Sequence, residues 1–209
     1  MTREEKLAGK YEQLSMFEKD AFLEGFRIVA GIDEAGRGPL AGPVVAAACI
    51  LREDKPILGL DDSKKLSPAK REILYEEILE KALCYSVVRI EHDVIDDINI
   101  LEATKRAMRT CVLELAVKPD LLLIDAVDLK GTGIPVRPII KGDAKSNSIA
   151  AASILAKVSR DRIMVEFDSI YPGYGFAKHK GYGTKEHYEA IETLSICPIH
   201  RRTFLKGHF

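Results

Sequence analysis

Short runs of apolar residues are the feature of this sequence that most restricts its fold. The run at 121–125 is apolar up to a final aspartate, and the run at 27–34 ends on an Asp-Glu pair. Runs this short and this apolar are typical of buried strands. We therefore predict strands at 27–34, 44–51, 84–91, 121–125 and 134–140.

Longer segments with helical periodicity lie between these runs. Residues 100–117 place their apolar side chains on one face, as an amphipathic helix does. Ser67 followed by Pro68 is a typical start for a helix that reaches about Leu83. Further helices are predicted at 3–24, ending at Gly25, and at 146–168 and 185–194. This order of elements predicts an α/β fold with a mixed central sheet flanked by helices.

The length of 209 residues favours one domain over several. We expect a single domain at 1–209, with an N-terminal helix at 1–25, a core at 27–169 and a short helical C-terminal extension at 170–209. No run of 18 apolar residues is present, which excludes a membrane span. The charged start shows no secretory signal, and the four cysteines lie far apart without a CxxC pair. We therefore expect a cytoplasmic protein with reduced thiols.

The charge is distributed unevenly along a chain whose net charge is only −1. Residues 171–209 carry six Lys or Arg against three Glu, so the body before them is acidic. Within this basic part, Tyr171 to Thr184 interleaves aromatic, glycine and basic residues, which suits stacking and phosphate contacts on nucleic acid. An ordinary solvated surface and an irregular loop explain the same features, so both interpretations stay open.

Carboxylates stand at the ends of several predicted elements. Asp33 and Glu34 end a buried strand before a glycine-rich turn, Asp125 ends another strand, and Asp143 precedes a helix. Buried charges are costly unless they are paired or bind metal. Neighbouring residues of a strand face opposite sides, so Asp33 and Glu34 reach one site only if the strand ends there. The alternative is that these carboxylates only form turns or cap helices. We expect that simpler role, as solvated acids in turns, for the pairs at 61–62 and 96–97.

Taken together, the four carboxylates form a group of hard oxygen ligands. Such ligands without cysteine or convergent histidine favour Mg²⁺ or Mn²⁺ over zinc. Two such ions can activate a water and stabilise the leaving oxygen of a phosphodiester. A rival interpretation of the turn, dinucleotide binding by Gly36, Gly38 and Gly42, fails on spacing, and the carboxylates before it would repel a pyrophosphate.

Several motifs in one order resemble a known family. The segments that carry the likeness are Gly31-Ile-Asp-Glu-Ala-Gly-Arg-Gly-Pro-Leu-Ala-Gly-Pro43, Asp62-Ser-Lys-Lys-Leu66, Leu122-Leu-Ile-Asp125, 142–161, His179-Lys-Gly-Tyr-Gly-Thr184 and His200-Arg-Arg-Thr-Phe204. They resemble the type 2 ribonuclease H family, specifically bacterial ribonuclease HII, and they cover residues 27–204.

The resemblance implies an RNase H-like fold and a metal-dependent endonuclease, with Mn²⁺ or Mg²⁺ as cofactor. Its substrates would be the RNA strand of RNA–DNA hybrids and ribonucleotide-containing duplex DNA. Incision would fall on the 5′ side of a single ribonucleotide and leave 3′-hydroxyl and 5′-phosphate ends.

The resemblance also implies roles for particular residues. The metal-binding, catalytic carboxylates would be Asp33, Glu34, Asp125 and Asp143. The backbone of Gly36, Arg37 and Gly38 would sense the ribose 2′-hydroxyl, the group that separates RNA from DNA. Tyr182 would lie against the same ribose. Candidate phosphate contacts are Lys64, Lys65 and Lys180.

The two ends of the sequence bear on the subtype and on protein partners. About 26 residues precede the first strand, which favours ribonuclease HII over HIII with its extra N-terminal domain. The ending at 203–209 lacks a Gln-initiated motif with paired aromatics and so gives no support for a sliding-clamp partner. We expect a monomer without membrane contact. The alternatives are another RNase H-like nuclease, such as a transposase or resolvase, and a catalytically idle hybrid-binding module.

Overall fold

A five-stranded mixed sheet forms the centre of the protein, which a computed structural model describes over residues 2–207. Its strands, in the order β3-β2-β1-β4-β5, are Cys84–Ile90, Val44–Ile50, Val29–Ala35, Leu121–Asp125 and Val136–Ile139. The first three are antiparallel neighbours, whereas β1, β4 and β5 run parallel. The predicted mixed α/β sheet is confirmed, with all five strands in place. Met1 of the expected N-terminal helix, and His208 and Phe209 of the ending, lie outside the described residues.

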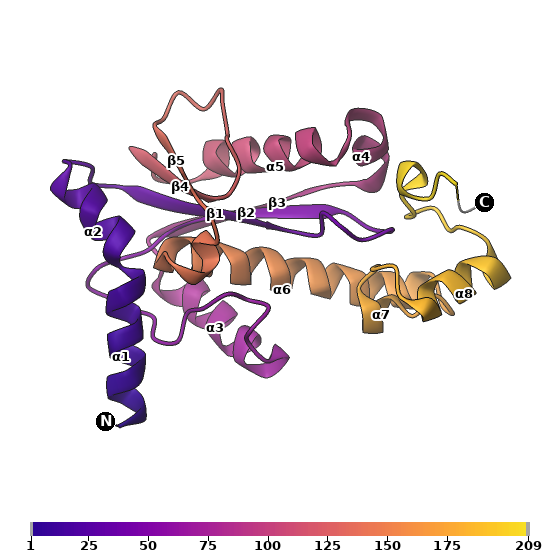
Figure 1. Ribbon diagram of the computed structural model, residues 1–209, viewed down its shortest axis with the longest axis horizontal. Helices are drawn as coiled ribbons and strands as arrows, with labels where there is room; N and C mark the ends of the chain where they lie inside the picture. Colours follow the sequence, from indigo (N-terminus) through magenta and orange to yellow (C-terminus); the bar gives the residue numbers. More distant parts are fainter. Residues whose placement is uncertain (1, 208–209) are drawn as a thin grey trace.

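Helices cover both faces of this sheet (Figure 1). The long helices are α1 (Arg3–Leu14), α2 (Met16–Leu23), α3 (Pro68–Lys81), α5 (Ile100–Glu114), α6 (Asn147–Ile170) and α8 (Lys185–Leu194). The short ones are α4 (His92–Ile98), α7 (Phe176–His179) and the 3-10 turns η1 (Gly142–Ala144) and η2 (Arg202–Phe204). Helix α5 packs on one face, and α6, with α3 outside it, packs on the other (Figure 1).

The alternation of side chains along β1 explains this layering. Ala30 and Ile32 face the α5 side, where they join a core cluster with Met108, whereas Val29 faces α6 and packs with Ile149. Both faces of the strand are therefore apolar, as the short apolar run predicts. The apolar first half of α6 is buried throughout because it lies between the sheet and the outer helices.

The expected single helix at 3–24 is in fact two helices that meet at Ser15. Leu14 packs in the cluster shared by α3 and α6, whereas Ala21 packs with Val29 beside β1. Because the two halves face different parts of the core, the chain changes direction between them. The Ser15 hydroxyl stabilises the break. It donates a hydrogen bond to the Tyr11 carbonyl and accepts one from the side-chain amide of Asn147 at the start of α6. The prediction of one helix was wrong for this tertiary reason.

The extension after α6 has a small core of its own. Phe176, Ile191 and Ile199 are buried there together with the rings of His187 and His200, whose Nε2 atoms lie 3.1 Å apart. Burial lowers the pKa of His187 to about 4, so this ring is neutral at physiological pH. Backbone hydrogen bonds join the extension to the glycine-rich segment after β1.

Two features expected from composition can also be compared with the structure. All four cysteines are free thiols. Over residues 2–207, the structure contains no helix that is both long and apolar enough to span a bilayer.

The close contact between β1 and α6 at Gly31 yields a stability prediction. A Cβ at Gly31 of β1 would lie 2.0 Å from the Ser148 carbonyl carbon of α6, so Gly31→Ala forces the helix off the sheet. We expect a loss of more than about 3 kcal/mol in the free energy of unfolding, measured by urea denaturation. Gly9→Ala, with open space around it on α1, is the control and should be neutral or stabilising by up to about 1 kcal/mol. Equal stability of the two variants would contradict the packing described.

Candidate active site

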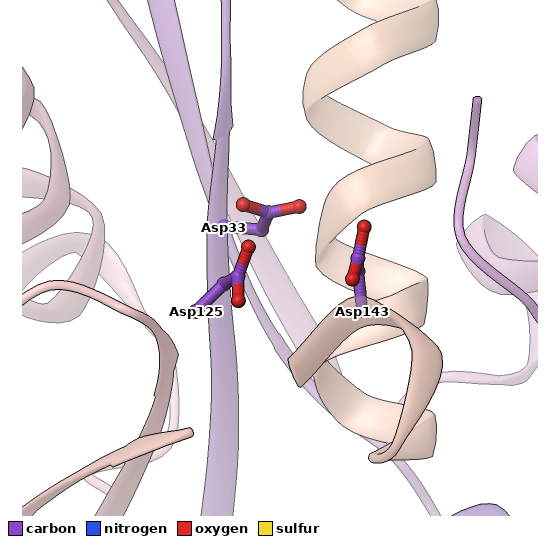
Figure 2. Close-up of side chains that lie close together, drawn as sticks. All are labelled: Asp33, Asp125 and Asp143. Atoms are coloured by element: carbon purple, nitrogen blue, oxygen red, sulfur yellow. The ribbon is translucent and has the colours of Figure 1, made fainter. Parts of the chain in front are cut away.

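Three carboxylates converge at one point on the α6 face of the sheet. Asp33 lies on β1, Asp125 is the last residue of β4, and Asp143 lies in η1 just before α6. One carboxylate oxygen from each lies within 4.8 Å of those of the other two. Figure 2 shows the three side chains facing a common space beside the helix. Asp33 and Asp143 are buried, and Asp125 is partly exposed.

The register of the parallel strands brings the first two together. Ile32 of β1 pairs with Ile124 of β4, so Asp33 and Asp125 follow at the same level and on the same face. The η1 turn then carries Asp143 toward them at the beginning of the helix that covers this face. Asp33, Asp125 and Asp143, three of the four carboxylates predicted from the sequence, are thus neighbours in space.

Glu34 lies outside this group. Strand β1 continues to Ala35, which pairs with Val45, so the strand does not end at the acid pair and Glu34 faces the α5 side. Its Oε1 atom accepts a long hydrogen bond of 3.4 Å from Arg37, and its buried Oε2 atom has no hydrogen-bond partner among the described residues. Burial raises the pKa of Glu34, the Arg37 charge lowers it, and the charge of nearby Asp125 raises it.

Burial and mutual repulsion shift the protonation of the group. Burial raises the pKa of Asp33 well above its usual range, the charge of Glu34 raises it further, and a hydrogen bond with Ser153 lowers it. Burial likewise raises the pKa of Asp143 to about 6, with additional repulsion from Asp62 and Asp125. Such a site attracts a cation, because positive charge offsets both the burial and the repulsion.

Two buried arginines hold the glycine-rich loop that follows β1. Arg201 donates to the carbonyls of Gly36 (2.7 Å), Arg37 (3.0 Å) and Gly42 (2.9 Å). Arg160 of α6 donates to the carbonyls of Pro43 (2.9 Å), Ala41 (3.2 Å) and Lys180 (3.0 Å). Neither guanidinium has a carboxylate partner among the described residues. The arginines therefore fix the backbone of the loop rather than neutralise the carboxylates.

The same loop meets the C-terminal extension at Tyr182. A Cβ at Gly38 would lie 3.7 Å from Cε1 of Tyr182, whose side chain is 44% exposed. The carbonyl of Tyr182 accepts a hydrogen bond of 2.9 Å from Nδ1 of His187. Gly36 has a φ of +95°, and a Cβ there would collide with Arg160, so this position needs glycine.

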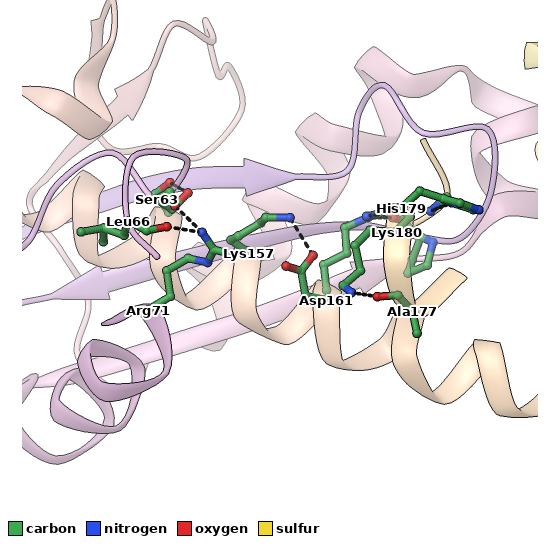
Figure 3. Close-up of polar contacts among 12 residues, drawn as sticks. Ser63, Leu66, Arg71, Lys157, Asp161, Ala177, His179 and Lys180 are labelled. Atoms are coloured by element: carbon green, nitrogen blue, oxygen red, sulfur yellow. Dashed lines mark hydrogen bonds and ion pairs between the residues drawn. The ribbon is translucent and has the colours of Figure 1, made fainter. Parts of the chain in front are cut away.

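The three lysines singled out in the sequence differ in their surroundings. Burial lowers the pKa of Lys64, but the carboxylates of Asp33, Asp143 and Asp62 together raise it above its ordinary value. This ammonium therefore faces the carboxylate group. Lys65 is exposed and lies 4.0 Å from Asp62. The Lys180 ammonium donates to the carbonyl of Ala177 (Figure 3).

The loop at 61–66 comes closer to the carboxylates than the sequence indicated. Asp61 forms an ion pair with Lys10, and Asp62 lies close enough to Asp143 to raise its pKa, so neither is the solvated acid expected. Ser63 bonds the hydroxyl of Ser153 at 2.9 Å, and Ser153 in turn bonds Asp33. Arg71 holds this loop by donating to two of its carbonyls (Figure 3).

In the other expected acid pair, Asp97 is exposed as expected, whereas Asp96 has specific partners. Asp96 accepts hydrogen bonds from the backbone amides of Arg202 and Thr203, so it fastens the C-terminal turn to α4.

Sequence reasoning also missed Arg160 and Arg201. For Arg160 a signal existed, since it follows the buried Ala156 by four residues and precedes the buried Met164 by four. An arginine on the apolar face of a helix indicates a buried guanidinium with specific partners. For Arg201 no local pattern points to burial.

Comparison with solved structures identifies the class. The crystal structure of the ribonuclease H2 from Pyrococcus horikoshii OT3 superposes with a TM-score of 0.73 at 31% identity, covering 85% of this chain and 93% of that one. An Archaeoglobus fulgidus RNase HII, solved in complex with PCNA, gives a TM-score of 0.72 at 28% identity over 86% of this chain and 94% of that one. The fold and the carboxylate group thus define an enzyme of the RNase H-like class.

Sequence comparison then gives the family. The family model described as Ribonuclease HII matches residues 30–209. A curated relative of that name from Listeria innocua is 54% identical over 202 residues, which are 97% of this chain and 77% of the relative. The chain belongs to the ribonuclease HII family and is a ribonuclease H enzyme.

The raised pKa of Asp143 predicts how stability depends on pH. Its pKa of about 6 in the folded state exceeds the usual 3.8, so the folded state binds more protons and stability falls as pH rises between these values. Without divalent ions, Asp143→Asn should therefore raise Tm at pH 8 by about 2–4 °C, which corresponds to about 1 kcal/mol. At pH 4 the difference should vanish.

The control for this experiment is Asp97→Asn, which changes the same charge on an exposed residue of α4. Differential scanning calorimetry at both pH values measures the effect. A Tm of Asp143→Asn equal to or below that of wild type at pH 8 would contradict the repulsion described.

Proposed function

We propose that this ribonuclease H incises duplex DNA on the 5′ side of single embedded ribonucleotides, besides cutting the RNA strand of RNA–DNA hybrids. The products are 3′-hydroxyl and 5′-phosphate ends. One observation carries the proposal: Gly36–Gly38 follows Asp33 of the carboxylate group by only three residues, and Gly38 lies beside the exposed Tyr182 ring. A carboxylate group beside a glycine-rich loop and an exposed ring suits a reaction that is directed by a ribose.

Gly38 and the neighbouring Tyr182 support recognition of the 2′-hydroxyl. The lack of a side chain at Gly38 lets a sugar approach the backbone, and the exposed Tyr182 ring lies beside that position. The 2′-hydroxyl is the group by which a protein distinguishes RNA from DNA at one position. Arg201 keeps the carbonyls of Gly36 and Arg37 turned inward, so the loop backbone is preorganised before the substrate arrives.

The carboxylates fit a divalent cation, in line with the divalent-metal dependence of ribonucleases H. Among residues 2–207, the ligand atoms that converge here are carboxylate oxygens, and they suit Mg²⁺ or Mn²⁺. We assign Asp33, Asp125 and Asp143 as ligands and add Glu34, because its buried Oε2 atom is without a partner among the described residues and its charge acts on Asp125. Bound cations supply the acidity that activates the attacking water and stabilises the leaving oxygen.

The remaining residues bind and orient the polyanion. Lys64 faces the carboxylate group and is placed to meet a phosphate that approaches it. Lys65 is free to swing toward the backbone, whereas Lys180 contacts phosphate once its ammonium leaves the Ala177 carbonyl. The ribonucleotide-containing duplex is the expected partner, and the monomeric state and cytoplasmic location stay predictions. Such incision would begin the removal of ribonucleotides from DNA.

A duplex with one ribonucleotide, end-labelled and incubated with Mg²⁺ or Mn²⁺, tests the proposal. We expect a single cut on the 5′ side of the ribonucleotide and none in an all-DNA duplex. Asp125→Asn should lower the rate by more than about 100-fold, since even the loss of partners outside the ligand set costs 10–100-fold at metal sites. Cleavage of the all-DNA duplex at a similar rate would contradict ribose recognition.

Gly38→Ala tests whether a ribose approaches the backbone at Gly38, without changing the stability of the protein. The added methyl has ordinary contacts and no strained φ, so the protein should keep its Tm. It should lower incision at the ribonucleotide by about tenfold or more, because it occupies the space for the ribose. Gly9→Ala, the same change on α1, is the control. Full activity of Gly38→Ala would show that no sugar approaches this position.

A further inference from the structure

A basic groove lies on the α5 side of the candidate active site. Its volume is about 520 Å³, and it runs between α5 and the loop that follows β4. Its charged lining consists of the cationic Arg37, Lys105, Arg109 and Lys130 and the anionic Glu102 and Asp128. Of the candidate substrate-binding residues, Arg37 lines the groove, and the role assigned to it involves its backbone only; lysines 64, 65 and 180 are not part of the groove.

The charges in the groove are not fully neutralised. Lys105 pairs with Glu102 at 3.3 Å, and Lys130 pairs with Asp128 at 3.7 Å. The side chain of Arg109 makes no hydrogen bond or ion pair among residues 2–207. With Arg37, which reaches only Glu34 at 3.4 Å, it leaves two guanidiniums available to an anion.

Two residues of the groove are near neighbours of the carboxylates along the chain. Ala126, which directly follows Asp125, lines it and has a φ of 50°. A left-handed conformation is uncommon for a residue with a side chain, and here it turns the loop out beside α5. Arg37 enters the groove from the glycine loop, so the groove begins where both strands end.

We infer that this groove binds a backbone phosphate of the substrate duplex, an inference that rests on the proposed function. Guanidinium groups bind phosphate oxygens in paired hydrogen bonds, and the groove has a net excess of two positive charges. It contains no aromatic side chain on which a base could stack. Lys64 lies on the α6 side, so the groove adds a contact on the other side of the sheet and holds the duplex across the strand ends.

Arg106 provides a matched control for Arg109. It lies on the same helix, is exposed, and does not line the groove. Binding of the one-ribonucleotide duplex is measured by fluorescence anisotropy without divalent ions, so that no cleavage occurs, at several salt concentrations. Arg109→Ala should weaken binding by about tenfold and reduce the slope of log K against log salt by about one, as the loss of one phosphate contact does. Arg106→Ala should leave that slope unchanged, and Arg109→Lys should restore it.

Equal slopes for wild type and Arg109→Ala would overturn the inference, as would an equal loss in Arg106→Ala. The wild-type protein is also assayed for incision of the same duplex with Mg²⁺, and its binding slope is measured on an RNA–DNA hybrid. If the wild-type protein fails to incise at the ribonucleotide, the proposed function is contradicted but the groove inference is not. The salt slopes of wild type and Arg109→Ala on the RNA–DNA hybrid then decide whether Arg109 contacts a phosphate.

Discussion

The convergence of three carboxylates beside α6, two of them buried, is the interaction on which the rest of the structure depends. Desolvation and repulsion raise the pKa values of Asp33 and Asp143, so without a cation the group opposes folding at neutral pH. The fold tolerates this cost because the surrounding elements are apolar and closely packed. The contact of α6 with β1 at Gly31 is so tight that no side chain fits there. A bound cation would offset this cost, so cation binding and folding are linked.

Two buried guanidiniums hold the glycine loop that follows β1 and its carboxylates along the chain. Burial lowers the pKa of Arg160 to about 10 and that of Arg201 to about 9, and both stay charged at neutral pH. Their hydrogen bonds go to backbone carbonyls of the glycine loop and of Lys180 rather than to carboxylates. The backbone of the loop is thus held in place beside a carboxylate group that attracts cations. Both guanidiniums are buried, so their role is to position the loop and not to contact a phosphate.

The parts of this arrangement that local patterns encode could be predicted from the sequence. The apolar runs gave the strands, and Asp33 and Asp125 stood at strand ends, where a parallel register brings side chains together. Features set by distant packing could not be predicted. The break at Ser15 depends on two separate core clusters, and the position of Asp62 beside Asp143 depends on how the 61–66 loop packs on α6. These contacts join residues far apart in the chain.

Titration with Mn²⁺, followed by the loss of the free-ion EPR signal, tests most directly whether the three carboxylates form a cation site. The wild-type protein should bind Mn²⁺ saturably, and Asp33→Asn should weaken that binding by more than about 100-fold. Asp97→Asn, which removes an exposed charge from α4, should bind as the wild type does. Equal Mn²⁺ binding by the wild type and Asp33→Asn would contradict a metal site at the ends of β1 and β4.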